Sequence, residues 1–337
     1  MKIIRKLLFP FSWLYGGITA LRNLFYDKGW LSSESFTIPV ICVGNLSVGG
    51  TGKSPMIEFL IEGLKEHHQV SVLSRGYKRK TTGYRKVTLD STAVEVGDEP
   101  LQFKQKHPDI QVAVCADRRH GIEQLKKGSD IILLDDAFQH RKVKPYINIL
   151  LSTFDDLYIH DHMLPTGNLR EYRSGADRAD FIVITKCPDH VAYAKLQRVQ
   201  FDLKLKPHQK IYFSRIGYDS KIFGKTEELD LEYLLDKQFT LVTGIAKPKP
   251  MIDYLSSRDF KFEHVSFPDH HTFTDSDLDV LKKKDIILTT EKDYMRLQDK
   301  LDKFALYYLP IKTLILNDQE VFFKNSILEM IADFKNT

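Results

Sequence analysis

A glycine-rich string between residues 44 and 54 has the residue types that bind phosphate. It reads GNLSVGGTGKS and follows the short apolar run VICV at 40–43. Backbone N–H groups of such a turn close on phosphate oxygens, and the following helix adds the favourable end of its dipole. In this pattern the lysine reaches the β- and γ-phosphates, and the next hydroxyl reaches Mg²⁺. The string therefore predicts a nucleotide phosphate site, rather than a chance glycine turn, at Ser47, Val48, Gly49, Gly50, Thr51, Gly52, Lys53 and Ser54.

A second string supplies the acids that a metal ion would need. Four apolar residues at 131–134 are followed directly by Asp135 and Asp136. A buried strand of this kind delivers a carboxylate to Mg²⁺ at its carboxyl end. Beside a phosphate loop, the pair predicts a metal site shared with Ser54. Which acid binds the metal, and which holds a water or orients Lys53, stays open at this point.

The elements around these strings predict an α/β fold. Near-continuous apolar runs, typical of parallel strands covered on both faces, alternate with helical patterns such as 53–65 and 117–127. This alternation predicts a P-loop NTPase-like, doubly wound and mostly parallel sheet. The expected strands lie at 39–44, 70–74, 111–116, 131–134, 147–151 and 181–185.

The same pattern suggests how the chain divides into domains. We expect the phosphate-binding and catalytic domain at 32–205 and a linker at 206–236, because the stretch 203–236 is polar and poor in strand signals. A smaller second α/β domain is expected at 237–337, with strands at 239–242 and 286–289 and a last helix near 319–335.

Composition narrows the class of protein. The 337 residues are 42% hydrophobic and 28% charged, which argues against a disordered, collagen-like or multi-span membrane protein. Three widely spaced cysteines, Cys42, Cys115 and Cys187, form neither a disulfide framework nor a CxxC metal site. A reducing compartment fits this cysteine usage.

The N-terminal segment 1–31 holds the whole net charge of +4, with five basic residues and one acidic residue. The remaining residues are neutral overall, which disfavours a nucleic-acid partner. The segment also carries both tryptophans and an apolar stripe at helical spacing. The stripe consists of Leu7, Phe11, Leu14, Ile18, Leu21 and Phe25.

Two interpretations of this amphipathic helix stay open, and they are compatible with each other. Its uncharged run, 7–21, is shorter than the roughly 20 residues that cross a bilayer. The stripe would therefore either enter the acyl boundary of a membrane, with Lys and Arg on anionic lipid, or pack against its own domain.

Together the strings resemble the tetraacyldisaccharide 4′-kinases of lipid A biosynthesis, over nearly the whole chain. Ser47 stands where the usual phosphate loop has glycine, and this family tolerates a hydroxyl residue there. The strings that carry the resemblance are GNLSVGGTGKSP (44–55), SRGYK (74–78), GDEP (97–100), DDAFQHR (135–141), PTGNLRE (165–171), TKCPD (185–189), TGIAKP (243–248), FPDHH (267–271) and TTEKD (289–293).

The resemblance implies a function. Members of this family use ATP and Mg²⁺ to phosphorylate the 4′-hydroxyl of a tetraacylated glucosamine disaccharide 1-phosphate, peripherally at the cytoplasmic face of a bacterial inner membrane. We expect the same here, in a monomer. The apolar stripe gives this setting a physical reason, because the acyl chains of such a substrate stay in the bilayer.

Matched position by position, Asp98 in GDEP corresponds to the general base and His270 in FPDHH to its partner. A carboxylate in hydrogen-bond reach accepts the proton of a sugar hydroxyl as the bond to phosphorus forms. From the residues alone, a helix N-cap is the favoured interpretation of Asp98, and the resemblance reverses that preference; His271 competes with His270. Because the two residues fall in different domains, both acting on one hydroxyl requires domain closure.

Three further residues are expected at the site. Arg119 and Arg170 would offset charge on the transferring phosphoryl group, and Glu171 would complete the Mg²⁺ shell. The alternative for all three is an ordinary surface ion pair.

Two other classes of function compete with the kinase. One is a P-loop GTPase or ATPase switch, or a metallochaperone-like protein; the other is a membrane scaffold whose nucleotide site is structural. Guanine recognition usually needs Asn-Lys-x-Asp, whereas residues 185–189 read TKCPD, which favours ATP.

Overall fold

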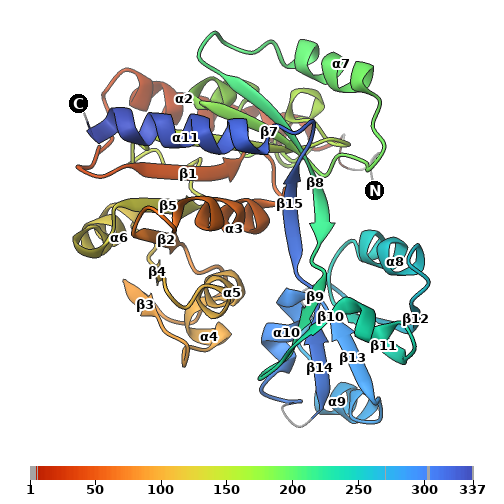
Figure 1. Cartoon of the computed structure of the whole chain (residues 1–337). Coiled ribbons are helices and arrows are strands. Elements are labelled where there is room, and N and C mark those ends of the chain that lie inside the picture. Colours follow the sequence, from red (N-terminus) through yellow and green to blue (C-terminus); the bar gives the residue numbers. More distant parts are fainter. Residues whose placement is uncertain (1–4, 6, 270, 302–303, 336–337) are drawn as a thin grey trace.

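Two β-sheets organise the chain, and each forms the centre of its own unit (Figure 1). The computed structural model describes residues 5, 7–269, 271–301 and 304–335. In Figure 1 the larger unit fills the top and left of the picture and the smaller unit the lower right, with two long strands, β8 and β15, running between them. The α/β class expected from the sequence is confirmed.

Among the described residues, the larger sheet has nine strands in the order β15-β8-β7-β6-β1-β5-β2-β4-β3. All neighbours pair in parallel except at the two edges, where β3 and β15 run antiparallel. The strands are β1 (Val40–Asn45), β2 (Val70–Ser74), β3 (Arg85–Val87), β4 (Gln111–Val114), β5 (Ile131–Asp135), β6 (Ile147–Thr153), β7 (Phe181–Thr185), β8 (Lys210–Tyr218) and β15 (Ile311–Ile315).

Helices cover both faces of this sheet, because its central strands are apolar on both sides. In β1, Ile41 and Val43 face one apolar core while Val40 and Cys42 face the other. The first core is covered by α3 (Lys53–Leu64), α4 (Ala93–Val96), α5 (Asp98–Lys106) and α11 (Glu320–Lys335), and the second by α6 (Arg118–Leu125) and α7 (Tyr193–Leu203). This is the doubly wound arrangement that alternating strands and helices predict.

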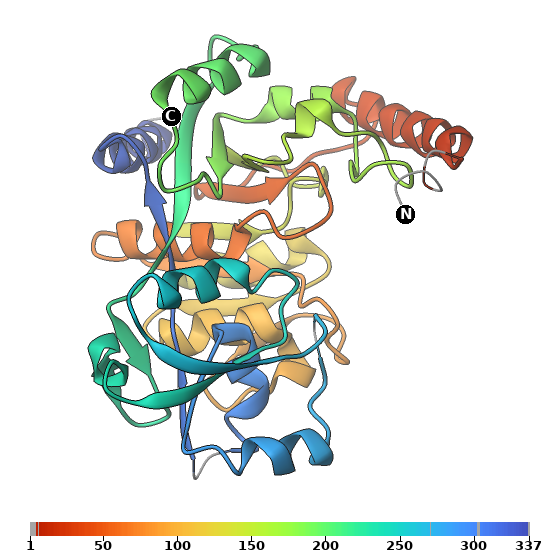
Figure 2. The same ribbon diagram turned by 90° about the vertical axis from the view of Figure 1, so that its right-hand side faces the viewer.

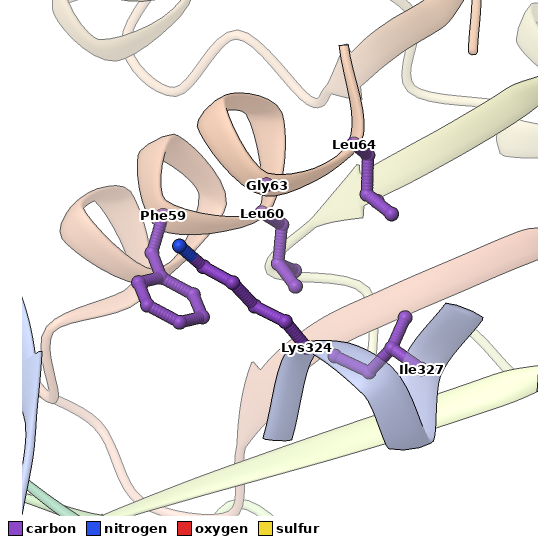
Figure 3. A pocket seen from close by; sticks show the side chains of 6 residues that line it. All are labelled: Phe59, Leu60, Gly63, Leu64, Lys324 and Ile327. Carbon is purple, nitrogen blue, oxygen red and sulfur yellow. The ribbon is translucent and has the colours of Figure 1, made fainter. Parts of the chain in front are cut away.

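Helix α11 packs against α3 through buried aromatic and aliphatic side chains. Phe323 stacks on Phe59 with ring centroids 5.7 Å apart, and the Lys324 ammonium lies 5.0 Å from the same Phe59 ring. A small pocket between the two helices is lined by Phe59, Lys324, Ile327 and their neighbours (Figure 3).

The second sheet has six strands among the described residues, in the order β10-β9-β14-β13-β11-β12. Its four strands β12, β11, β13 and β14 are parallel, and helices again connect them. The elements are β9 (Lys221–Phe223), β10 (Glu228–Asp230), β11 (Gln238–Thr243), α8 (Lys249–Ser256), β12 (Lys261–Ser266), α9 (Asp275–Leu281), β13 (Ile286–Thr289), α10 (Glu291–Leu297) and β14 (Ala305–Tyr308).

The stretch 206–236, expected to be a strand-poor linker, instead contains β8, β9 and β10. The nine-residue β8 lies next to the sheet edge and is only partly buried, and polar residues such as the half-buried Arg215 interrupt its apolar run. Farther along the chain, β15 returns to the larger sheet and pairs with β8. The domain limits stay a prediction, and sheet membership groups 311–335 with the larger unit.

The N-terminal helix α2 (Phe9–Asp27) presents most of the expected apolar stripe to solvent, whereas Phe25 is half-buried. The side that packs on the larger unit is small and polar, with Ser12, Gly16 and Thr19 buried. Leu14 and Ile18 are 66% and 62% exposed. Figure 2 shows α2 along the outer edge of the larger unit. In the part of the chain that the structure describes, no helix is both long and apolar enough to cross a membrane.

Candidate functional site

The glycine-rich loop joins the carboxyl end of β1 to the first turn of α3. Strand β1 lies between β5 and β6, so the loop sits where successive connections leave the sheet in opposite directions. Such a switch point is where open α/β sheets bind ligands. Gly49 and Gly52 have φ of +112° and +87°, a conformation that other residues rarely adopt. With glycine at its N-cap, α3 points its first N–H groups at the loop, which suits an anion.

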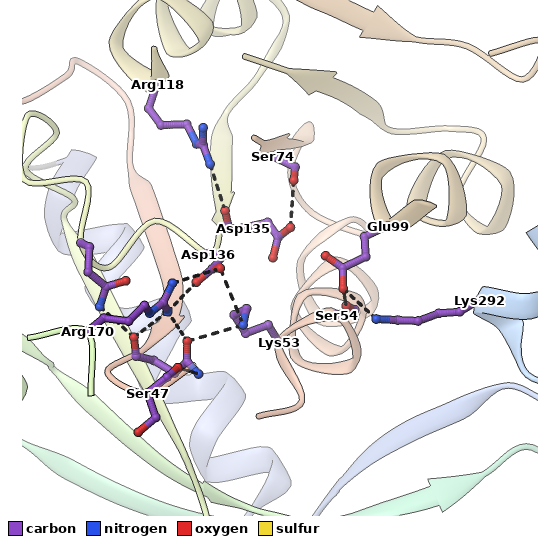
Figure 4. A network of polar contacts seen from close by, with 12 residues as sticks. Ser47, Lys53, Ser54, Ser74, Glu99, Arg118, Asp135, Asp136, Arg170 and Lys292 are labelled. Carbon is purple, nitrogen blue, oxygen red and sulfur yellow. Dashed lines mark hydrogen bonds and ion pairs between the residues drawn. The ribbon is translucent and has the colours of Figure 1, made fainter. Parts of the chain in front are cut away.

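Lys53 extends from α3 toward an acid and an amide (Figure 4). Its Nζ lies 3.8 Å from Asp136 Oδ2 and 3.5 Å from Asn45 Oδ1. The Asp136 carboxylate also pairs with Arg170 at 2.9 Å. Burial would raise the pKa of Asp136, but Lys53 and Arg170 outweigh it and lower that pKa. Of the two acids, Asp136 is the one that pairs with Lys53 in the structure.

Asp135, at the end of β5, has the character of a metal ligand. One oxygen accepts a 2.9 Å hydrogen bond from Ser74 Oγ. The other, Oδ1, is buried with no hydrogen-bond partner among the residues that the structure describes. Burial, with the nearby Glu99 and Asp136 carboxylates, raises the pKa of Asp135 to about 7. A cation beside this oxygen would remove that penalty.

Glu99 is a site residue that the sequence analysis missed. Ser54 Oγ donates to Glu99 Oε1 at 3.0 Å, and Lys292 Nζ lies 3.0 Å from the same oxygen (Figure 4). Burial would raise the pKa of Glu99, but the Lys292 ammonium outweighs it and the pKa is lowered. The signal in the sequence was weak, because an acid in a first helical turn is common at any N-terminus.

The oxygens of Ser54, Glu99 and Asp135 fit Mg²⁺, which prefers hard oxygen ligands and keeps part of its shell for phosphate and water. Within the described ranges, no three His, Cys, Asp or Glu side chains form a preformed metal cluster. The unpartnered Asp135 oxygen is the feature that a bound cation would explain.

Asp98 is the first residue of α5, and Gly97, with φ +94°, takes the N-cap position. The N-cap alternative for Asp98 is therefore wrong. Its carboxylate instead accepts a hydrogen bond from Arg296 of α10. His270 lies outside the described residues. His271 is bound to Asp277 at 2.9 Å.

The three weaker predictions have different outcomes in the structure. Arg170 lies at the site, where it also donates to the Asn45 carbonyl at 2.9 Å. Arg119 instead faces Asp117 and Glu34, at 3.6 and 4.0 Å. The neighbouring Arg118, buried in the core, is the arginine that reaches the Asp135 carbonyl, because its turn of α6 faces the sheet.

Glu171 does not share the environment of Ser54 and Asp135. It is fully buried, pairs with Arg178 at 2.9 Å and accepts from Gln139 at 2.9 Å and Asn23 at 2.8 Å. These three donors occupy the carboxylate, which differs from the metal-binding role expected for it. Glu171 instead connects α2 to the segment that holds Arg170.

Comparison with known proteins agrees with this arrangement. The model of the tetraacyldisaccharide-1-P 4′-kinase family matches residues 4–332. The tetraacyldisaccharide 4′-kinases of Flavobacterium johnsoniae and Flavobacterium psychrophilum are 50% and 48% identical, over 99% and 97% of both chains. The chain belongs to the tetraacyldisaccharide 4′-kinase family. The resemblance expected from the motifs is thus confirmed.

A solved member of the family shares the fold. The LpxK structure from Aquifex aeolicus, determined in complex with ATP, superposes with a TM-score of 0.79 at 31% identity. The match covers 97% of this chain and 99% of that one. The match to the tetraacyldisaccharide 4′-kinase family therefore covers both sheets and α2. The alternative of a GTPase switch or metallochaperone is not favoured.

Proposed function

We propose that this chain transfers the γ-phosphoryl group of ATP to the 4′-hydroxyl of tetraacyldisaccharide 1-phosphate. The observation that carries the proposal is the hydrogen bond from Ser54, at the end of the phosphate loop, to Glu99. Glu99 is adjacent to Asp98 in the chain, so this contact supports a position for Asp98 near the end of the phosphate loop. The names of the full-length relatives support the same reaction.

In this proposal the loop residues 47–54 bind the triphosphate. Their N–H groups contact phosphate oxygens, and Lys53 moves from Asp136 to the β- and γ-phosphates. Arg170, fixed by Asn45 and Asp136, offsets negative charge at the same end of the nucleotide. The ATP-bound relative supports ATP as the nucleotide.

Ser54, Asp135 and Glu99 would hold Mg²⁺, and Asp136 would orient Lys53. The ion, when bound, neutralises phosphate charge that builds up during transfer. Asp135 is the acid of the pair that suits direct ligation, because its second oxygen has no other described partner.

Asp98 would act as the general base, with His270 as its expected partner. The 4′-oxygen attacks the γ-phosphorus while its proton passes to the Asp98 carboxylate. A new oxygen–phosphorus bond forms, the bond between the γ-phosphorus and the β,γ-bridging oxygen breaks, and ADP leaves. Arg119 lies near Asp117 and Glu34 in the structure, and its expected role beside the phosphoryl group stays a prediction.

Helix α2 would bring the site to the lipid. Its outward face is apolar, and Lys28 and Arg22 add positive charge near it, which suits an anionic bilayer surface. We propose peripheral binding at the cytoplasmic face of the bacterial inner membrane. A monomer is sufficient, because one chain supplies every residue of the proposed site.

The test is a transfer assay with radiolabelled ATP and defined disaccharide 1-phosphate in detergent micelles. We expect labelled lipid that depends on Mg²⁺ and is abolished by Asp98→Ala. Release of free phosphate without labelled lipid would contradict the proposal and indicate a nucleotide switch. Absence of both products would indicate a scaffold.

A further inference from the structure

Two cations of α10 face the two carboxylates that open α5, although the helices belong to different units. Lys292 lies 3.0 Å from Glu99, and Arg296 Nη2 donates to Asp98 Oδ2. Residues four apart lie on one face of a helix, so the two cations point the same way. The helices are in contact, and Figure 1 shows them at the boundary between the units. The second unit thus supplies positive charge to the acids beside the phosphate loop.

The Arg296 guanidinium also contacts Asp293, which is itself fixed by hydrogen bonds. Asp293 is fully buried, and its Oδ2 accepts from Gly244 N at 2.8 Å and Thr290 Oγ1 at 2.7 Å. Its Oδ1 lies 3.4 Å from Arg296 Nη1. An arginine fixed in this way loses little additional rotamer freedom when it binds a second carboxylate.

We propose that Arg296 is a positioning residue for the Asp98 carboxylate. The hydrogen bond from Arg296 engages Asp98 Oδ2, and in this proposal Asp98 Oδ1 accepts the proton of the acceptor hydroxyl. A carboxylate in the first turn of a helix otherwise rotates freely, and loss of alignment slows a reaction even when both substrates bind. The inference rests on the proposed role of Asp98 as the base.

The competing explanation is that Arg296 only joins the two units. Lys106 is an example of such a contact, because it bridges Glu58 of α3 and Glu291 of α10 at 2.5 and 2.9 Å, on the same boundary. Loss of a purely joining contact would lower stability and weaken binding of both substrates. Loss of a positioning contact would lower kcat and leave binding intact.

The experiment compares Arg296→Met and Arg296→Lys with a matched control, Lys284→Met. Lys284 forms a 2.6 Å ion pair with Glu263 in the same unit, away from α5. We expect Arg296→Met to lower kcat at least about 20-fold while the Kd for ATP and the KM for the lipid change less than about twofold. Arg296→Lys should recover most of the lost rate, and Lys284→Met should match the wild type.

A double-mutant cycle with Asp98→Asn tests whether Arg296 acts through Asp98. We expect Arg296→Met to cause no further loss of kcat in the Asp98→Asn background. An additive loss, a Lys variant as slow as the Met variant, or a change in binding alone would overturn the inference. Wild-type kcat in Asp98→Asn would instead refute the base assignment itself, so the two failures are distinguishable.

Discussion

Asn23 of α2 donates a 2.8 Å hydrogen bond to the buried Glu171 carboxylate, 148 residues farther along the chain. Glu171 also accepts from Gln139, whose side chain donates to the Asn45 carbonyl at the start of the phosphate loop. The outer helix is therefore attached to the base of the nucleotide site through two side chains. Tyr15 adds a second attachment by donating to the Arg170 carbonyl at 3.0 Å.

Asn23→Ala should lower the free energy of unfolding by about 1–3 kcal/mol, because a buried carboxylate oxygen loses a donor. Urea denaturation measures this change. Leu21→Ala, at an exposed position on the same helix, is the control and should change stability by less than about 0.5 kcal/mol. Equal values for the two variants would show that the Asn23 contact adds nothing to stability.

Replacing Leu14 and Ile18 together by serine should weaken binding to anionic vesicles at least tenfold, on the order of the transfer energy of two apolar side chains. Vesicle co-sedimentation measures the binding, and rising salt should weaken it further. The fold should be unaffected, because both side chains are exposed.

The matched control for this prediction is the double serine variant of Val321 and Phe322. These residues are equally exposed but lie on α11, away from α2. If this control binds vesicles as poorly as the α2 variant, a general loss of surface hydrophobicity explains the result and α2 has no special role.

Lys53→Ala should reduce phosphoryl transfer at least about 100-fold, since the lysine contacts the transferring group directly in phosphate-loop enzymes. Asp136 keeps its bond to Arg170 in this variant, so the unfolding midpoint should stay near that of the wild type. Lys65→Ala, at the other end of α3, should retain full activity. A Lys53→Ala rate above about a tenth of the wild-type rate would contradict the phosphate contact.

Acid should destabilise the protein through His107, which follows α5. Burial, with Lys65 and Lys106 nearby, lowers the pKa of His107 to about 4. The unfolded chain therefore binds a proton near pH 6.5 that the folded chain takes up only near pH 4. The contribution of the neutral His107 to the free energy of unfolding is fully present above pH 6.5 and is lost as the pH drops toward 4.

His107→Gln should remove about 2–3 kcal/mol of the stability difference between pH 7 and pH 4.5. Urea denaturation at the two pH values gives this difference, and any effect of the substitution that is independent of pH cancels. His67→Gln, which removes an exposed histidine of the α3–β2 connection, is the control. A pH dependence unchanged in His107→Gln would refute the prediction.

The phosphate loop and the two acids at the end of β5 were predictable because their signals are local. A glycine turn, its lysine and its hydroxyl occupy neighbouring positions, and a buried strand before two acids is visible in the sequence alone. The apolar stripe of α2 was equally visible, since its period is that of one helix. Which side of α2 faces the core was left open, because sequence periodicity does not show what packs against a stripe.

The missed features depend on distant parts of the chain. Glu99 is recognised as part of the candidate site only through its contacts with Ser54 and with Lys292, which lies in the second unit. Arg118 and Arg119 are adjacent, and only the rotation of α6 decides which one reaches Asp135. Strand β8 was overlooked because it is only partly buried, so its apolar pattern is weak. Its outer neighbour, β15, begins almost a hundred residues later, so the pairing is not visible in the local sequence.

The late return of β15 and α11 to the larger sheet also affects how the protein is made. Phe323, Ile327 and Ile331 of α11 are almost fully buried in the core that Phe59 and Phe181 share. During synthesis on the ribosome these partners emerge long before α11 does, so the nucleotide-binding half exposes an apolar surface until the second unit has been translated. Domains usually fold in the order of synthesis; here the first unit to begin folding must be the last to finish.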